Sequence, residues 1–384
     1  MDKRMEYGVF VKCRRYLLII ISLLQAPLFA SVEPALFYQN LREPTPQWMT
    51  EQIERDLSPF QGRLSRMHLD SFYAKYCEYN HLIRVRIVKG EIFVEKSSHA
   101  SPSLAEFILQ AVFKMHYLAP LPDLDFIFTT HDVMSYLVAM QAKMDPDNLI
   151  WPVFTISKDK LCANVILMPD WYALDGFGPD KAAVLEGRRV SLWEHKKRIA
   201  FFRGADSGAG HRPGWRETPR CRLVALSLQY PDLIDAKFTC LLPYEKDSSI
   251  RDVMLSEGMV GDYVPIQNFS RYRYLMDVDG HSANTPRVAL CLYSGSVLFK
   301  HASNEVLWFF TRLKPYEHFI PVAADFSDLV TQIEWAKNHD EECRQIADNA
   351  YQLAEEVLRE ECVYLYFYRL LEAYAKKQSE WHYD

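Results

Sequence analysis

The sequence predicts an α/β protein in which two domains each contain a β-sheet. The chain has 384 residues, which is long for one hydrophobic core and suits two domains of ordinary size. Short apolar runs alternate with segments of helical periodicity, and such alternation predicts parallel sheets covered by helices. Two of the apolar runs, within residues 201–207 and 274–280, lead into turns with glycine. Open α/β sheets bind ligands at strand ends of this kind.

The composition is that of a folded protein with an acidic balance. Hydrophobic residues make up 49% and charged residues 24%, which excludes a disordered chain. The formal net charge of −6 at pH 7 argues against non-specific binding of polyanions, so we expect no nucleic-acid partner. Of the eight cysteines, seven lie scattered beyond residue 30 without a CxxC pair, and this is not the pattern of a disulfide scaffold.

Residues 1–30 have the order of a secretory signal, with a basic region before an apolar run from Tyr16 to Ala30. The run is shorter than the roughly twenty residues that span a bilayer. We therefore expect a signal peptide or a signal-anchor rather than the alternative, a buried N-terminal helix. The expected location is the secretory route or a membrane: the lumen in a eukaryote, or a membrane anchor with a cytosolic catalytic part in a bacterium. The basic residues are Lys3, Arg4, Lys12, Arg14 and Arg15.

The first domain is expected over residues 31–185. Prolines punctuate residues 31–60 and discourage a continuous helix there, although Trp48–Leu57 has helical periodicity. Glycine at position 90 predicts a hairpin between two strands, and a helix follows. The expected elements are strands at 82–88, 92–94, 125–130, 152–156 and 165–168, and a helix at 103–117.

The second domain is expected over residues 186–345, after a linker at 176–195. It alternates strands at 198–202, 233–238, 274–277 and 296–300 with helices at 220–230, 268–272 and 287–294. Helices are also expected at 329–338 and 340–376. The last of these is long enough for residues 346–384 to cross back onto the first domain.

The two strand-end turns suit a phosphate. Arginine offers a fixed fork of donors to phosphate oxygens, and glycine lets the backbone approach closely. Arg203 lies inside the first turn, while Arg220 and Arg287 follow the turns at the starts of predicted helices, where anion sites form. The alternative is that these are solvated surface arginines.

These segments resemble glycosyltransferase family 90, which includes protein O-glucosyltransferases and transferases that modify capsules or lipopolysaccharide. The resemblance covers Phe201 to Arg203, Pro219-Arg220, Pro231 to Leu233 and Tyr272 to Arg287, and Asp56 to Phe60 matches an earlier landmark. It implies a GT-B-like fold, in which two Rossmann-like domains face a cleft and a C-terminal helix crosses back.

The resemblance also implies an inverting transfer from a UDP-sugar, UDP-glucose or UDP-xylose, to a hydroxyl of a protein or of a lipopolysaccharide or capsule glycan. One alternative is a catalytically silent glycan-binding or chaperone-like relative. Another is an unrelated α/β nucleotide-binding enzyme, which is disfavoured because the sequence has neither a Gly-rich dinucleotide fingerprint nor a P-loop.

Asp132 is the expected general base. Inverting transfer needs a carboxylate that takes the proton of the acceptor hydroxyl. Asp132 comes just after the strand at 125–130, where capping of the next helix is the alternative role. The resemblance of Leu121 to Asp132 to the family's Leu-Pro-Asp…Arg-Asp segment favours the base. His131 stands where the family has arginine, and as a base it is the weaker candidate.

The resemblance assigns Arg220 and Arg287 to the donor diphosphate. Asn284 and Thr285 would add hydrogen bonds from the loop before Arg287, and Arg203 would bind the donor or hold its own loop. Ala205 stands where relatives have a donor-contacting serine.

Two further features have competing interpretations. Asp277-Val278-Asp279 could hold a divalent cation against a diphosphate, but in the family arginines take that role, so we expect no metal and no cofactor besides the UDP-sugar. Trp171 resembles part of the family's loop on the acceptor side; the alternative is a tryptophan packed between the domains.

Overall fold

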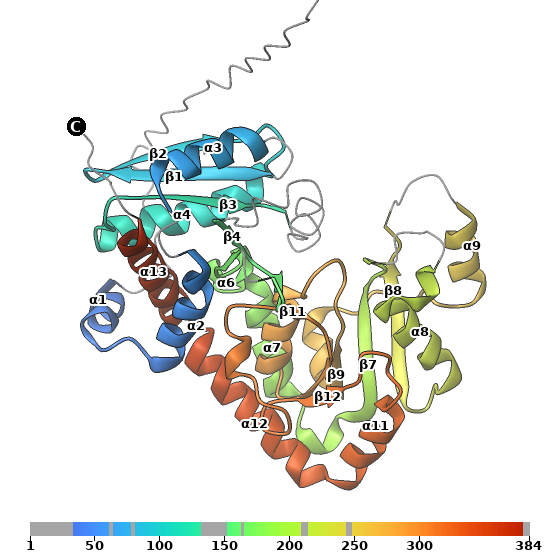
Figure 1. The fold of residues 1–384 in the computed structure, drawn as a ribbon. Coiled ribbons are helices and arrows are strands. Elements are labelled where there is room, and N and C mark those ends of the chain that lie inside the picture. Colours follow the sequence, from blue (N-terminus) through green and yellow to red (C-terminus); the bar gives the residue numbers. More distant parts are fainter. Residues whose placement is uncertain are drawn as a thin grey trace, which may run out of the picture.

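The computed structural model describes residues 34–60, 64–77, 81–131, 152–162, 165–208, 214–242 and 248–378. These residues form two α/β units, which Figure 1 shows one above the other. The first unit spans 34–174 and the second 178–357, and each contains a five-stranded sheet. The expected targeting segment, residues 1–30, and the expected base, Asp132, lie outside the described residues.

The sheet of the first unit is mixed, whereas the sequence predicted a parallel sheet in each half. Its strand order is β2-β1-β3-β4-β6, and β1 runs antiparallel to both β2 and β3. The predicted hairpin is present: a tight turn at Lys89 and Gly90, both with positive φ (52° and 81°), folds β2 back onto β1. The antiparallel pairing of β1 with β3 was not predicted. The strands are β1 (Leu82–Val88), β2 (Glu91–Lys96), β3 (Leu124–Thr129), β4 (Val153–Thr155) and β6 (Ile166–Leu167).

Helices cover this sheet, and three of them were not predicted: α1 (Pro34–Arg42), α3 (Arg66–Tyr76) and α6 (Trp171–Leu174). The helix α1 begins at Pro34 and ends at Arg42, before the next proline at position 44. Proline at the first position of a helix is tolerated because that N–H has no partner within the helix. The other helices are α2 (Gln47–Leu57), η2 (Ser58–Phe60), α3 (Arg66–Tyr76), α4 (Pro102–Leu118) and α6 (Trp171–Leu174).

The sheet of the second unit is parallel throughout, as predicted. Its order is β12-β10-β9-β7-β8, and every neighbouring pair is parallel. Its strands are β7 (Lys197–Ala205), β8 (Ile234–Cys240), β9 (Tyr272–Asp277), β10 (Val297–His301) and β12 (Ile320–Val322). Its other elements are η4 (Trp215–Glu217), α8 (Pro219–Gln229), α9 (Ser248–Ser256), η5 (Ile266–Arg271), α10 (Thr285–Tyr293), η6 (Phe310–Arg312), α11 (Leu329–Asn338) and α12 (Asp340–Val357).

The expected linker at 176–195 contains a helix, α7 (Gly178–Val190), followed by η3 (Trp193–His195). This helix packs against η5 and α10, so it is part of the second unit, and the expected boundary after residue 185 falls inside it. A Cβ on Gly187 would lie 2.2 Å from the Gln267 carbonyl oxygen. Glycine therefore permits the close contact of α7 with η5.

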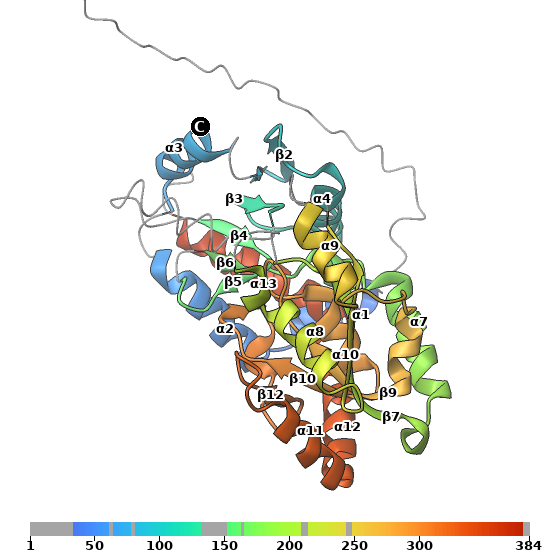
Figure 2. The same cartoon turned by 90° about the vertical axis from the view of Figure 1, so that its right-hand side faces the viewer.

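Among the described residues, the units share a hydrophobic core, and a small sheet and a returning helix also connect them. A two-stranded antiparallel sheet pairs β5 (Lys158–Asp159) with β11 (Glu305–Val306), and Lys158 also forms a buried ion pair with Asp56, 2.6 Å apart. The helix α13 (Glu360–Lys377) returns to the first unit and packs on α1, α2 and α4, as Figures 1 and 2 show.

The predicted return of the C-terminal helix is thus confirmed, although a break after Val357 divides the expected 340–376 helix into α12 and α13. The two-sheet architecture and this return confirm the GT-B-like expectation. None of the helices in the described part of the chain is both long and apolar enough to cross a lipid bilayer.

Candidate functional site

The candidate site lies at the carboxyl ends of β7 and β9, which are neighbouring strands of the parallel sheet. After each strand the chain enters a helix, α8 or α10, and an arginine stands in the first turn of each: Arg220 and Arg287. Helix N-termini carry unpaired N–H groups and partial positive charge. The two guanidinium groups add to that charge, so the edge of the sheet is suited to an anion.

Asn284 joins the two arginines. With the amide oriented by its hydrogen-bond partners, its side-chain oxygen accepts from Arg287 Nε at 3.1 Å and from Arg220 Nη2 at 3.2 Å. Both guanidinium groups also lie near the ring of Phe202, with Cζ 4.8 Å from its centroid for Arg287 and 5.7 Å for Arg220. Three of the five residues predicted for the donor are therefore gathered at one point.

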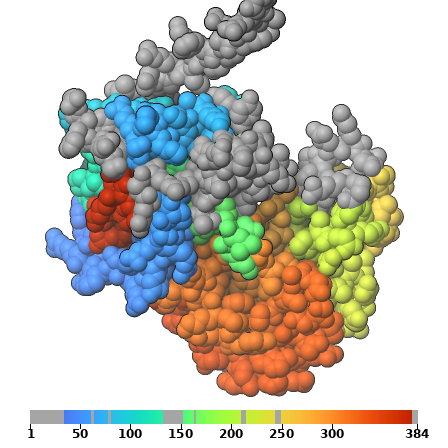
Figure 3. Space-filling model, viewed as in Figure 1, coloured from blue at the N-terminus to red at the C-terminus, as the bar shows by residue number. Residues whose placement is uncertain are grey.

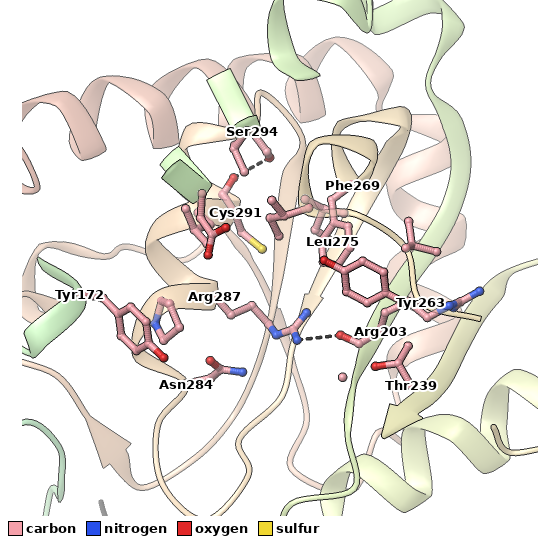
Figure 4. Close-up of a pocket in the computed structure, with 17 residues that line it drawn as sticks. Tyr172, Arg203, Thr239, Tyr263, Phe269, Leu275, Asn284, Arg287, Cys291 and Ser294 are labelled. Carbon is pink, nitrogen blue, oxygen red and sulfur yellow. Dashed lines mark hydrogen bonds between the residues drawn. The ribbon is translucent and has the colours of Figure 1, made fainter. Parts of the chain in front are cut away.

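Arg287 is a partly buried cation, and the partners it contacts directly are neutral. Its Nη2 donates to the Arg203 carbonyl oxygen at 2.7 Å, the bond drawn in Figure 4. No carboxylate within the described residues forms an ion pair with it. Burial lowers the pKa of the Arg287 guanidinium, which is the direction expected for a cation removed from water. A bound anion would offset this desolvation.

Arg220 is held by both strand-end loops. Its Nη1 donates to the Ala205 carbonyl at 2.9 Å and to the Ser207 hydroxyl, and its Nε donates to the Val278 carbonyl at 3.2 Å. The guanidinium therefore has a fixed orientation before any ligand binds, which lowers the entropic cost of binding.

The glycines of the two turns make room for these arginines. A Cβ on Gly204 would lie 3.1 Å from Arg287 Nη2. A Cβ on Gly280 would lie 2.4 Å from Ser207 Oγ and 3.0 Å from Arg220 Nη2. The sequence predicted that these glycines would let the backbone approach a phosphate closely. In the structure, they let the backbone approach the two arginines.

Arg203 and Thr285 have different surroundings. The Arg203 guanidinium lies 2.7 Å from Asp235 Oδ1 and donates to the backbone carbonyls of Phe202 and Asp235 at 2.9 and 3.0 Å. Its charge is thus paired, which agrees with the expected alternative that it holds its own loop. Thr285 is the first residue of α10 and is buried.

A cavity of about 300 Å³ opens beside Arg287. Both units line it: Tyr172 of α6 contributes from the first unit, and Asn284, Arg287 and Tyr263 contribute from the second (Figure 4). Its apolar lining includes Ile266, Phe269, Leu275 and Leu290. Arg203 and Arg287 form its polar end, and a polar end with an apolar remainder is the usual composition of a small-molecule site.

Comparison with known proteins decides the family. The model of glycosyl transferase family 90 matches residues 43–380. The chain belongs to this family. Protein O-glucosyltransferase 2 of Danio rerio is 27% identical over 350 residues, which cover 90% of this chain and 65% of the zebrafish protein. Protein O-glucosyltransferase 3 of Mus musculus is 29% identical over 244 residues, covering 63% of this chain and 43% of the mouse protein.

The chain thus spans 65% and 43% of the lengths of these two relatives. Protein O-glucosyltransferase 1 of Mus musculus is covered over 79% of its length, at 26% identity. Among solved structures, Anabaena HepE in complex with UDP-glucose has a TM-score of 0.40 and 10% identity, over 70% of this chain and 76% of that chain.

Trp171 and its neighbour Tyr172 occupy different environments beside the cavity: Trp171 is packed in the core, and Tyr172 lines the cavity. Asp170 caps α6, accepting from the N–H groups of Tyr172 and Ala173 at 3.0 and 3.2 Å, and burial raises its pKa to about 6. The cap directs Trp171 into the hydrophobic core shared by both units, whereas Tyr172 is 42% exposed and lines the cavity. The packing of Trp171 agrees with the alternative interpretation, and its acceptor-side role stays a prediction.

The sequence reasoning did not single out Tyr172, Asp180 or Tyr263, all of which line the cavity. Tyr172 follows Trp171, which the resemblance singled out, so its position next to Trp171 could have indicated the site. Asp180 lies in the first turn of α7, which the sequence analysis placed in a linker. Nothing in the pattern around Tyr263 indicated a site.

The expected base, Asp132, comes directly after His131, the last residue that the structure describes before a gap. His131 is described, and its ring lies 5.1 Å from the ring of His81 in a T-shaped contact. Asp132 itself lies outside the described residues, so its role stays a prediction.

Proposed function

We propose that this chain is an inverting glycosyltransferase that moves a sugar from a UDP-sugar, UDP-glucose or UDP-xylose, to an acceptor hydroxyl. The observation that carries the proposal is the Arg220–Asn284–Arg287 constellation at two helix N-termini, beside a cavity that both units line. It matches the charge of a nucleotide diphosphate, and the apolar lining suits the uracil and sugar.

The proposed reaction divides the work between the units. Charge builds on the diphosphate as its bond to the sugar breaks, and Arg220 and Arg287 stabilise that charge through fixed donors. Asp132, from the first unit, accepts the proton of the acceptor hydroxyl as its oxygen attacks the anomeric carbon from the opposite face. The arginines supply the positive charge, so the proposal includes no metal.

A protein hydroxyl is the proposed acceptor, because the relatives at 26–29% identity are named protein O-glucosyltransferases. A glycan acceptor of the lipopolysaccharide or capsule type is the alternative. We also propose that residues 1–30 direct the chain to the secretory route or to a membrane. Recovery of the chain from cytosol with Met1 intact would contradict that part.

The test is release of UDP with a panel of acceptors. UDP-glucose and UDP-xylose are each incubated with a panel of folded proteins and with glycans, and UDP is measured by a coupled luminescent assay. An increase of about 162 Da in the mass of the acceptor indicates transfer of a hexose, and an increase of about 132 Da indicates transfer of a pentose. Binding of UDP without transfer to any acceptor would favour the catalytically silent alternative, and a folded protein that binds no UDP would overturn the proposal.

A further inference from the structure

A buried acidic cluster lies at the carboxyl end of β9. Asp277 is 1% exposed and Asp279 is 8% exposed. Lys300, the partner of Asp277 on the neighbouring strand β10, places its Nζ 3.3 Å from Asp277 Oδ2. Glu305 of β11 adds a third negative charge that acts on Asp279. Two aspartates thus share one lysine, with Glu305 acting on one of them, so the cluster carries excess negative charge when all three carboxylates are ionised.

Two carboxylate oxygens in this cluster have no hydrogen-bond partner among the described residues: Asp277 Oδ1 and Asp279 Oδ2. Buried polar atoms normally have partners, so these oxygens call for an explanation. An ionised carboxylate only accepts hydrogen bonds, whereas a protonated one also donates. Burial, then the charge of Asp277, raises the pKa of Asp279 to about 7. His301, also near Asp277, has its pKa lowered by burial and adds little positive charge at neutral pH.

The residues on both sides of Asp279 contact Arg220. The Val278 carbonyl accepts from Arg220 Nε at 3.2 Å, and the Cα of Gly280 is so close that a Cβ would lie 3.0 Å from Arg220 Nη2. The same Nη2 also donates to Asn284. Asp279 is therefore one residue from the backbone that holds an arginine of the anion site.

We propose that Asp279 takes up a proton from solvent when an anionic diphosphate binds at Arg220 and Arg287, and so links donor binding to pH as a positioning residue. This rests on the proposed function, because it assumes that the anion at the arginines is a nucleotide diphosphate. The anion brings negative charge close to a cluster that already has an excess of it, and a nearby like charge favours the protonated form of a carboxyl. Protonation lowers the repulsion and leaves Arg220 in place.

The direction of the pH dependence follows from linkage. Asp279 is largely ionised above its pKa of about 7, so binding above that pH requires a proton from the buffer. If protonation and binding are coupled tenfold, affinity falls between about five- and tenfold from pH 6 to pH 8.5, and about half a proton is taken up per donor at pH 7.5.

Calorimetric titration of the full chain with UDP-glucose measures this uptake. The diphosphate of UDP-glucose has no ionisation near neutral pH, so protons taken up belong to the protein. Titrations at pH 7.5 in buffers of different ionisation enthalpy give the number of protons bound. We expect wild type to take up about half a proton, as above. Asp279→Asn, which is always neutral, should take up none and should bind with the same affinity from pH 6 to pH 8.5.

Two other variants complete the design. Asp277→Asn removes the like charge next to Asp279, so the fall in affinity should move to lower pH. This variant decides the question if Asp279→Asn does not fold. Asp348→Asn is the control: Asp348 lies on α12, is 59% exposed and does not line the cavity, so proton uptake should equal that of wild type.

Each outcome separates this inference from the function on which it rests. UDP-glucose binding to wild type without proton uptake overturns the role of Asp279 and leaves the proposed function standing. Uptake that persists unchanged in Asp279→Asn also overturns it. A folded wild-type protein that binds neither UDP-glucose nor UDP overturns the proposed function, and this inference with it.

Discussion

Replacing Arg287 with alanine is the sharpest test of the proposed site. Arg287 makes three kinds of contact in the structure: a hydrogen bond to the Arg203 carbonyl, one to Asn284, and a cation–π contact with Phe202. Each of these partners is neutral, and the residue is partly buried. Its charge is therefore unpaired within the described residues until an anion binds.

The size of the effect follows from this arrangement. A hydrogen bond to a charged group contributes about 1.5–3 kcal/mol, so the dissociation constant for UDP should rise roughly tenfold to a hundredfold in Arg287→Ala. Stability should change little, because the loss of two hydrogen bonds at about 1 kcal/mol each is offset by removal of a partly buried cation. The turnover number should fall as well, because charge on the diphosphate grows during transfer.

Isothermal titration with UDP at constant ionic strength measures the affinity, and thermal unfolding checks the fold. Arg287→Lys should restore affinity only in part, because an ammonium cannot reach the Arg203 carbonyl and Asn284 with the planar fork of arginine. Arg222→Ala is the matched control: Arg222 lies on α8, is 37% exposed and pairs with Glu217, so UDP affinity should not change. A folded Arg287→Ala protein that binds UDP within twofold of wild type would remove Arg287 from the site.

Four further outcomes are expected. Asp132→Asn should fold and bind UDP but lose transfer by about 10²–10⁴-fold in a UDP-release assay, since an amide cannot accept the proton; turnover within a few-fold of wild type rules Asp132 out as the base. Transfer should persist in excess EDTA, and complete loss that Mn²⁺ restores would support a metal at the Asp-x-Asp segment instead. Gly280→Ala should weaken UDP binding more than it lowers the melting temperature, because the new Cβ displaces Ser207 and Arg220; unchanged affinity would show that the arginine tolerates the shift. Asp170 has a pKa raised to about 6 by burial, so wild type loses stability as pH rises from about 4 through 6, and urea unfolding should show Asp170→Asn gaining up to about 3 kcal/mol over wild type in that interval; a pH-independent difference contradicts this.

The sequence predicted the second unit better than the first, for a physical reason. A parallel sheet buried on both faces produces nearly continuous apolar strands, and these are easy to recognise. The strand β9 is buried at all six positions, and α11 was predicted with its observed bounds, Leu329–Asn338. In the first unit, the antiparallel pairing of β1 with β3 joins strands that are far apart in the sequence, which no local pattern encodes. The helix α1 was not predicted because prolines discourage a helix, whereas Pro34 stands at its first position.

The linker prediction failed because α7 buries few side chains. Only Val184 and Gly187 are buried along it, so its apolar periodicity is weak, and its contact with η5 depends on a glycine. Tertiary packing, rather than local pattern, decides such a helix.

For the site, arginines next to strand ends could be predicted because parallel strands bring their carboxyl ends to one edge of the sheet. The sequence placed Arg220, Asn284 and Arg287 in the same site, and the structure joins them through one amide. The bond that Asn284 makes to both guanidinium groups could not be predicted, because it depends on side-chain orientation. Tyr172 reaches the cavity only through the packing of α6 between the units, which no local pattern encodes.

The acidic cluster and the arginines of the candidate site both lie at the same edge of the second sheet. Lys300 already contacts Asp277, and burial raises the pKa of Asp279 to about 7. Arg287 donates to the Arg203 carbonyl and to Asn284, and Arg220 donates to the Ala205 carbonyl and to Asn284. Two guanidinium groups and two buried carboxylates thus lie at one edge of the sheet. If the proposed function holds, Arg287→Ala should reduce transfer far more than excess EDTA does.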